Sequence, residues 1–145
     1  MDDIIRLSYV VPGDDFTRAG EASGLLKKNL KMLGIDPEIV RRVSIAIYEG
    51  EINMVIHAHG GKIDVEINPQ RIIMVLKDDG PGIPNVELAM QEGWTTAPDD
   101  VRSLGFGAGM GLPNMKKYTD YMHIDTQVGV GTTVTMKIDL YSQLS

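Results

Sequence analysis

The segment at residues 36–58 limits the possible folds of this chain more than any other, because it is helical in pattern and apolar on nearly every side. Asp36 suits the N-cap, Pro37 suits the first turn, and the glycines after His59 end the helix. One face carries Val40, Val43, Ile47, Gly50 and Met54, and much of the opposite face carries Ile45, Ile52 and Ile56. Because such a helix is buried, the rest of the chain must supply layers that cover it.

Alternating and apolar segments predict that covering layer. Strands are predicted at residues 4–11, 62–67, 71–77, 121–128 and 132–140. Residues 72–76 are apolar without interruption, which predicts a central strand buried on both faces. Further helices are predicted from Asp14 or Asp15 to about Leu33, near residues 86–91 and from residue 112. Because many links are hairpins, we predict an α/β two-layer sandwich of a mixed, mostly antiparallel sheet with helices on one face.

Length and composition exclude several classes of protein. The 145 residues fit a single domain spanning residues 1–145. The chain has no cysteine, which excludes disulfides, thiolate zinc sites and a cysteine nucleophile, and agrees with a cytoplasmic location. The net charge of -6 argues against direct nucleic-acid binding. Neither a secretory signal nor a membrane span is predicted.

Two polar side chains interrupt the apolar helix. Glu49 and Asn53 lie one turn apart and therefore side by side. A buried carboxylate needs partners or a raised pKa, because burial disfavours its charge. The pair could form a structural hydrogen bond. Alternatively, the amide oxygen could hold a divalent cation while the carboxylate acts beside it.

A first glycine loop, "DDGPGI" at residues 78–83, directly follows a predicted strand. Gly80 and Gly82 allow a tight turn and the approach of a flat ligand. The carboxylate of Asp78 could accept a hydrogen bond from an exocyclic amine such as that of adenine. The same residues are also ordinary turn formers.

A second glycine loop, "GFGAGMGLPNM" at residues 105–115, places a glycine at every second position before a helix. Free backbone N–H groups at a helix N-terminus suit phosphates, although glycines also serve as hinges. The spacing matches neither the Rossmann fingerprint nor the Walker A loop. The long irregular segment before it, from residue 92, has the length of a functional loop.

These three blocks, in this order, resemble the nucleotide-binding boxes of the gyrase, Hsp90, histidine-kinase and MutL (GHKL) superfamily. "DDGPGIPNVELAMQEGWTT", "GFGAGMGLPNMKKYTDYMHI" and "GVGTTVTMKI" resemble more closely the small serine kinases of bacterial partner switching. These are the anti-sigma-factor kinases and the stressosome switch kinase. The resemblance implies a Bergerat-type ATP-binding fold with a mobile ATP lid at about residues 92–110.

The resemblance also implies roles for particular residues. Asn53 would ligate Mg²⁺, Glu49 would act as general base, and Asp78 would bind the adenine of ATP. The remaining contacts to the nucleotide would come from Gly80, Gly82, Arg102, Gly105, Gly107, Gly109, Met110, Gly111, and Thr132 or Thr133. Gly50 and Glu51 depart from the family pattern of small or apolar residues, so we expect close packing at Gly50 and a solvent- or partner-facing Glu51.

The implied function is an ATP-dependent protein serine/threonine kinase that phosphorylates a small antagonist protein. The same surface could hold a sigma factor or another regulator, and a homodimer is a possible assembly. The alternative is a nucleotide-dependent module that sequesters a partner without phosphoryl transfer. Glu49 favours the kinase, because binding alone does not need a base. A histidine-kinase catalytic domain is less favoured, because no residues remain for a phosphoacceptor helix pair.

Overall fold

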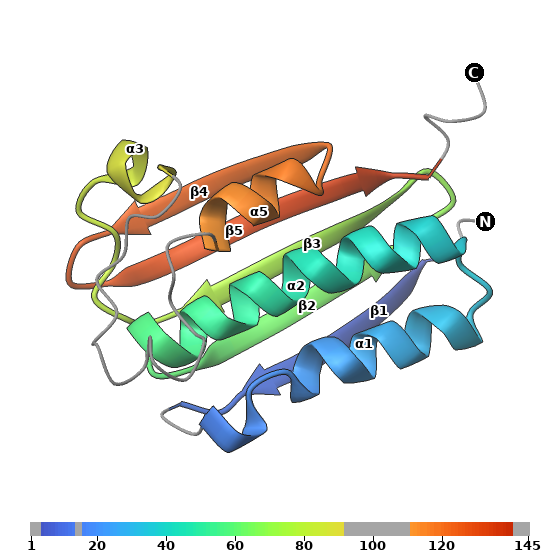
Figure 1. Cartoon of the computed structure of the whole chain (residues 1–145), viewed down its shortest axis with the longest axis horizontal. Helices are drawn as coiled ribbons and strands as arrows, with labels where there is room; N and C mark the ends of the chain where they lie inside the picture. The colour runs from blue at the N-terminus through green and yellow to red at the C-terminus, as the bar shows by residue number, and fades with distance from the viewer. Residues whose placement is uncertain (1–3, 14–15, 92–110, 141–145) are drawn as a thin grey trace.

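The computed structural model describes residues 4–13, 16–91 and 111–140, which form a five-stranded sheet with helices on one face (Figure 1). The strands are β1 (Ile5–Val11), β2 (Gly61–Ile67), β3 (Arg71–Asp78), β4 (Tyr121–Gln127) and β5 (Gly131–Asp139). Their order in the sheet is β1-β2-β3-β5-β4. The predicted α/β sandwich is confirmed.

The prediction of a mixed sheet is wrong for the described strands, because all four neighbouring pairs are antiparallel. The chain leaves β3, enters the sheet again at the edge as β4, and returns as β5 between β4 and β3. This hairpin brings β5 back alongside β3 in the opposite direction, so no parallel crossover is needed.

The helices are α1 (Glu21–Met32), α2 (Pro37–His57), α3 (Val86–Ala89) and α5 (Gly111–Lys117), with a 3₁₀ turn, η1, at Phe16–Arg18. In Figure 1, α2 lies across the middle of the sheet, between α1 and α5. The predicted start of α2 is confirmed, since the Asp36 carboxylate accepts a hydrogen bond from the Glu38 N–H at 2.9 Å. No described helix is both long and apolar enough to span a membrane.

The predicted start of α1 is wrong. The helix begins at Glu21, after Gly20, which has a left-handed backbone with φ of 99°. No side chain of its own segment caps it. Instead, the carboxylate of Glu51 accepts hydrogen bonds from the N–H groups of Gly20, Ala22 and Ser23. Asp14 and Asp15 lie outside the described residues.

The same contact corrects the expectation that Glu51 faces solvent or a partner, because its side chain is 0% exposed. The cost of burying its charge is offset by the positive end of the α1 dipole and by three N–H groups that have no acceptor within their own helix. Helical periodicity placed Glu51 correctly on α2 but gave no information about which neighbour would cover it.

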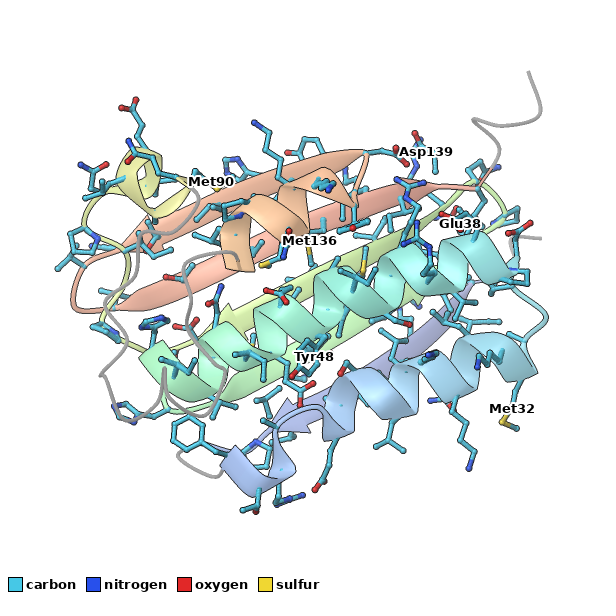
Figure 2. All side chains as sticks on the ribbon, viewed as in Figure 1. Met32, Glu38, Tyr48, Met90, Met136 and Asp139 are labelled. Carbon is cyan, nitrogen blue, oxygen red and sulfur yellow. The ribbon has the colours of Figure 1, made fainter. Side chains whose placement is uncertain are left out.

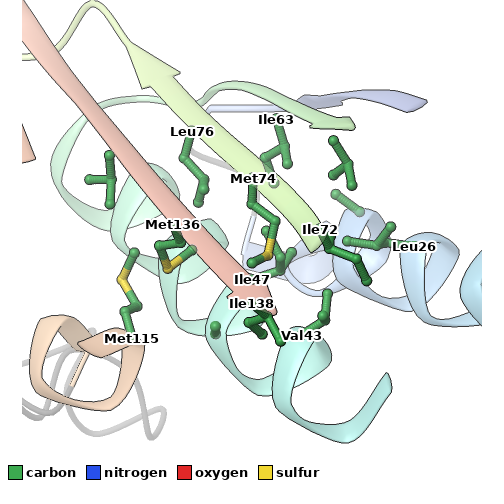
Figure 3. Close-up of a cluster of buried hydrophobic side chains, with 14 of the residues drawn as sticks. Leu26, Val43, Ile47, Ile63, Ile72, Met74, Leu76, Met115, Met136 and Ile138 are labelled. Atoms are coloured by element: carbon green, nitrogen blue, oxygen red, sulfur yellow. The ribbon is translucent and has the colours of Figure 1, made fainter. Parts of the chain in front are cut away.

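The core lies between the helices and the inner face of the sheet (Figure 3). Its fully buried side chains include Leu26, Ile47, Ile63, Ile72, Met74, Leu76, Met136 and Ile138. Gly50 lies where α2 crosses the sheet, and a Cβ there would overlap Cδ2 of Leu76. The predicted close packing at Gly50 is confirmed.

The predicted burial of β3 on both faces is wrong. Its inner residues Ile72, Met74 and Leu76 are buried, whereas Ile73 and Val75 on the opposite face are only partly buried. That face also carries ion pairs between neighbouring strands, such as Arg71–Asp139 at 3.6 Å. The strand is central in the sheet, but the described helices cover one face alone.

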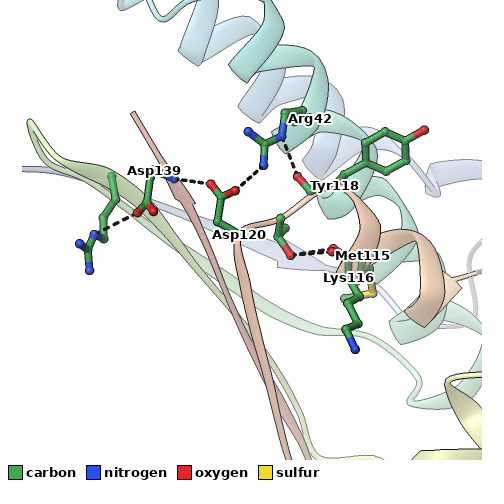
Figure 4. Close-up of polar contacts among 8 residues, drawn as sticks. Arg42, Met115, Lys116, Tyr118, Asp120 and Asp139 are labelled. Carbon is green, nitrogen blue, oxygen red and sulfur yellow. Dashed lines mark hydrogen bonds and ion pairs between the residues drawn. The ribbon is translucent and has the colours of Figure 1, made fainter. Parts of the chain in front are cut away.

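Arg42 joins the end of α5 and the start of β4 to α2 (Figure 4). Its Nε donates to the carbonyl of Tyr118 at 3.0 Å, and its Nη2 donates to the Asp120 carboxylate at 3.1 Å. The second oxygen of Asp120 accepts from the Asp139 N–H at 2.8 Å. These bonds hold α5 beside the part of α2 that carries Glu49 and Asn53.

Candidate functional site

Asp78 ends β3 in a partly buried position. Its Oδ1 accepts hydrogen bonds from the N–H of Gly80 at 2.9 Å and from the N–H of Thr132 at 3.2 Å. Burial raises the pKa of Asp78, these two hydrogen bonds lower it, and the charge of Asp79 raises it further. The second carboxylate oxygen accepts no hydrogen bond from the described residues, so it is available to a ligand.

Thr132 lies beside Asp78, because the two residues face each other in the β3–β5 register. Its side chain is 8% exposed, and its hydroxyl lies 2.8 Å from that of Thr126. Thr126 also accepts from the N–H of Ile83 at 2.8 Å, which fixes the loop after Asp78. Thr133 belongs to the opposite face of β5, because strand residues alternate. Of the two predicted threonines, Thr132 therefore lies at the site.

Gly80 lets the loop after β3 approach the end of α2, because a Cβ on Gly80 would lie 2.7 Å from Cα of Ala58. Gly82 has a φ of 82°, which other residues rarely adopt, and turns the loop against the end of β4. Gly131, which the sequence analysis did not single out, lets β5 pass against the carbonyl of Asp78. The loop glycines thus bring β3, β5 and α2 together around one carboxylate.

Asn53 is partly buried on α2, and Gly111 begins α5 beside it. A Cβ on Gly111 would lie 2.9 Å from Nδ2 and 3.0 Å from Oδ1 of Asn53, so the missing side chain leaves room at the amide. The nitrogen makes a weak contact with Sδ of Met115 at 4.0 Å. The amide oxygen accepts no hydrogen bond from the described residues and has the chemistry of a Mg²⁺ ligand.

No group of three histidine or acidic side chains in the described part of the chain could hold a metal. A cation at Asn53 would therefore be bound mainly by water and by the oxygens of a ligand. Mg²⁺ often binds in this way, with one or two protein ligands and several phosphate or water oxygens.

Glu49 lies one turn before Asn53 and is partly buried. Burial raises the pKa of its carboxyl, and a hydrogen bond with Asn114 of α5 lowers it. Asn114 was not singled out in the sequence, since its contact depends on how α5 packs against α2. Glu49 also lines an open groove of about 370 Å³ between α1 and α2. A desolvated carboxylate that is reachable from outside can serve as a general base.

The candidate residues follow one another along α2. The Asp78 loop meets the helix at Ala58, and Asn53 and Glu49 lie further towards the N-terminus. At a rise of about 1.5 Å per residue, Glu49 and Asn53 are separated by about 6 Å along the axis. The structure therefore arranges an acceptor for an amine, a potential cation ligand and a candidate base in a row.

Some predicted residues cannot be placed in this row. Arg102, Gly105, Gly107, Gly109 and Met110 lie outside the described residues, as does the predicted lid at residues 92–110. Gly111 is described and lies next to Asn53.

Comparisons with known proteins agree with the resemblance found in the sequence. The family model for histidine kinase-, DNA gyrase B- and HSP90-like ATPases matches residues 38–142. The anti-sigma F factor of Clostridium beijerinckii is 33% identical over 111 residues, which cover 71% of this chain and 74% of that protein. The serine/threonine-protein kinase RsbT of Bacillus subtilis is 30% identical over 108 residues, which cover 72% and 75%.

Solved structures share the fold at lower identity. The RsbU and RsbW domains of a Mycobacterium tuberculosis protein align with a TM-score of 0.60 at 18% identity, over 94% of this chain and 32% of that one. The mycobacterial sensor histidine kinase MprB aligns with a TM-score of 0.53 at 18% identity, over 93% and 97%. The predicted superfamily is confirmed: this chain belongs to the histidine kinase-, DNA gyrase B- and HSP90-like ATPases and is related to the anti-sigma F factors.

Proposed function

We propose that this chain is an ATP-dependent protein serine/threonine kinase of a bacterial partner-switching system. Its substrate would be a small antagonist protein that carries an acceptor serine or threonine. The observation that carries the proposal is Glu49, a partly buried carboxylate of raised pKa that lies one turn from Asn53 and opens on a groove. A module that only bound nucleotide would not need this group.

The described residues fit ATP with Mg²⁺. The oxygen of Asp78 that accepts no hydrogen bond from the described residues would accept from the adenine amino group, while Gly80, Gly82 and Thr132 shape that end of the site. Asn53 would hold Mg²⁺ through its amide oxygen. When bound, Mg²⁺ neutralises phosphate charge and aligns the phosphates for transfer.

The second glycine loop completes the proposed ATP site. Gly105, Gly107, Gly109 and Gly111 would donate backbone N–H groups to the phosphates. Arg102 would add a positive charge near the terminal phosphate, and Met110 would line the pocket. These roles follow from the family resemblance, and Gly111 has structural support through its position beside Asn53.

Glu49 would accept the proton of the acceptor hydroxyl at its carboxylate. Its raised pKa brings it closer to neutral pH than that of an exposed glutamate, which favours proton transfer. Asn114 of α5 interacts with this carboxylate and lowers its pKa by less than burial raises it. The same surface would also bind a sigma factor or another regulator, as the names of the anti-sigma F factors suggest.

The test is a phosphotransfer assay. The purified chain is mixed with Mg-ATP and the small antagonist protein encoded nearest to it, and phosphoserine and phosphothreonine are measured by mass spectrometry. We expect one modified hydroxyl on the antagonist. A chain that binds ATP and retains the antagonist or a sigma factor without modifying either would instead be the sequestering module.

A further inference from the structure

Glu51 is the one fully buried carboxylate in the described part of the chain, and the proposed reaction does not use it. Its Oε2 accepts from the N–H of Gly20 at 2.9 Å and of Ala22 at 3.2 Å, and its Oε1 accepts from the N–H of Ser23 at 3.0 Å. These N–H groups lie at the start of α1, where a helix has no internal acceptors for them. One side chain in the middle of α2 therefore holds the first turn of α1.

That first turn forms one wall of the groove on which Glu49 opens. The α1 wall consists of Gly20, Ser23, Gly24 and Lys27, and the α2 wall consists of Ser44, Ile45, Tyr48 and Glu49. Gly20 and Ser23 line the groove and also bind Glu51. Tyr48 lies between the two helices (Figure 2), and its Cε1 is 3.4 Å from the position of a Cβ on Gly20. Glu51 thus sets the distance between the α1 wall and Glu49.

We propose that Glu51 is a positioning residue for the protein substrate: it holds the α1 wall so that the hydroxyl-bearing segment of that substrate enters the groove beside Glu49. This inference rests on the proposed kinase function. The groove of about 370 Å³ has room for a few side chains, and its glycines and serines let another backbone approach closely. Glu49 itself lines this groove, and the proposed transfer requires Glu49 to contact the hydroxyl.

The adenine end of the proposed site lies elsewhere, since the Asp78 loop meets α2 at Ala58, about two turns beyond Glu51. Asn53 is only two residues from Glu51, but its amide lies against α5, whereas the Glu51 carboxylate binds the start of α1. Loss of the Glu51 contacts should therefore weaken substrate binding and spare ATP binding. A contact that stabilises the bound substrate and the transition state equally affects only binding, so its loss raises KM and leaves kcat unchanged.

The first test variant is Glu51→Gln, which keeps the side-chain size but replaces one acceptor oxygen with a donor that faces N–H groups. We expect KM for the antagonist protein of the kinase assay to rise about tenfold or more, while kcat and ATP affinity change less than about twofold. Glu51→Asp keeps the charge with a shorter reach, so it should show a smaller rise in KM.

The second test variant is Gly24→Leu, which leaves Glu51 intact and fills the groove. No atom lies within 4 Å of a Cβ built on Gly24, so a side chain can start there without a clash at its Cβ. We expect the same rise in KM. Ile138→Val is the matched control, because it weakens the core on β5 away from the groove. KM should not change in this control.

An unchanged KM in Glu51→Gln overturns the inference even if the wild type transfers phosphate normally, and the kinase proposal then stands. If Glu51→Gln does not fold, Glu51→Asp decides in the same way. An equal rise of KM in Ile138→Val also overturns the inference, because the effect would then reflect stability alone. A wild type that transfers no phosphate overturns the kinase proposal and this inference with it.

Discussion

Glu49 and Asp78 share an electrostatic property that matters at the scale of single residues. In both side chains, burial is the largest influence and raises the pKa of the carboxyl. A carboxyl whose pKa is raised on folding stabilises the fold below its unfolded pKa, and this contribution is lost as pH rises through the folded pKa. Ionisation of either group as the pH rises through its folded pKa therefore opposes folding. Such groups occur at functional sites more often than elsewhere.

Glu49→Gln tests the proposed base directly. The amide keeps the size of the side chain but cannot accept the hydroxyl proton, so transfer to the antagonist should fall by about 10²- to 10⁴-fold. ATP affinity, measured by calorimetry, should change less than about twofold, because Glu49 is not among the residues proposed to contact adenine or Mg²⁺. Transfer within a few-fold of wild type would remove Glu49 from the mechanism.

The same substitution tests the burial of Glu49 through stability. At neutral pH, Glu49→Gln should have a higher free energy of unfolding than wild type, because a neutral group replaces a desolvated charge. The difference should shrink as pH falls through the raised pKa of Glu49, because the wild-type carboxyl then becomes protonated and is neutral like the glutamine. Urea titrations at several pH values measure it. A difference that grows towards acid pH would contradict the assignment.

Asp78→Asn separates the loop structure from ligand binding. The remaining amide oxygen can still accept from the N–H groups of Gly80 and Thr132, so the loop should persist. The new NH₂ group would face the adenine amine, donor against donor. We expect nucleotide affinity to fall by about tenfold to a hundredfold, which is the range for loss of a hydrogen bond to a charged group. Unchanged affinity with normal folding would place the adenine elsewhere.

At the scale of elements, the contact of α2 with the sheet depends on Gly50. A Cβ there would overlap Cδ2 of Leu76 and lie 3.2 Å from Cε of Met115, and both side chains are buried. Overpacking of a core of this kind costs about 1–3 kcal/mol. We therefore expect Gly50→Ala to lower the free energy of unfolding, although alanine favours helix by about 1 kcal/mol over glycine.

Gly24→Ala is the matched control for that measurement. Gly24 lies inside α1, and no atom is within 4 Å of a Cβ built on it. Only the helix propensity should therefore act, and the free energy of unfolding should rise by up to about 1 kcal/mol. If both substitutions stabilise the chain in urea titrations, Leu76 can move aside and α2 does not need a glycine at this crossing.

The elements differ in how far the sequence could predict them, and the difference has a physical cause. The start of α2 was predictable because Asp36 and Pro37 act locally, through bonds within one turn. The start of α1 was not, because its cap is Glu51, 28 to 31 residues away. The burial of β3 was overestimated, because an apolar run cannot show which face the helices leave open.

The site shows the same division. Glu49, Asn53 and Asp78 could be singled out in the sequence as polar residues within or at the end of apolar elements, and the family resemblance supplied their expected roles. The choice of Thr132 over Thr133 required the β3–β5 register, which places Thr132 opposite Asp78. The contact of Asn114 with Glu49 required the packing of α5 on α2, which no local pattern contains.

At the scale of the whole molecule, the proposed nucleotide site joins elements that are distant in the sequence. Asp78 ends β3, Thr132 belongs to β5, Asn53 belongs to α2, and Gly111 begins α5. A ligand that contacts all four elements binds the folded chain and not the unfolded one. Binding should therefore stabilise the molecule as a unit.

Thermal unfolding with Mg-ATP measures that coupling. At a ligand concentration of about 100 times Kd, the folded state gains about 2.7 kcal/mol. For a chain of this length, Tm should rise by roughly 5–10 °C.

Removal of Mg²⁺ with EDTA should reduce the rise, and Asn53→Ala should make the remaining rise insensitive to EDTA, because the proposed ligand is gone. Asp78→Asn should show a much smaller rise at the same ATP concentration. Equal stabilisation of wild type and Asp78→Asn would mean that ATP binds outside the row of residues along α2, and the proposed roles of Asn53 and Glu49 would be wrong with it.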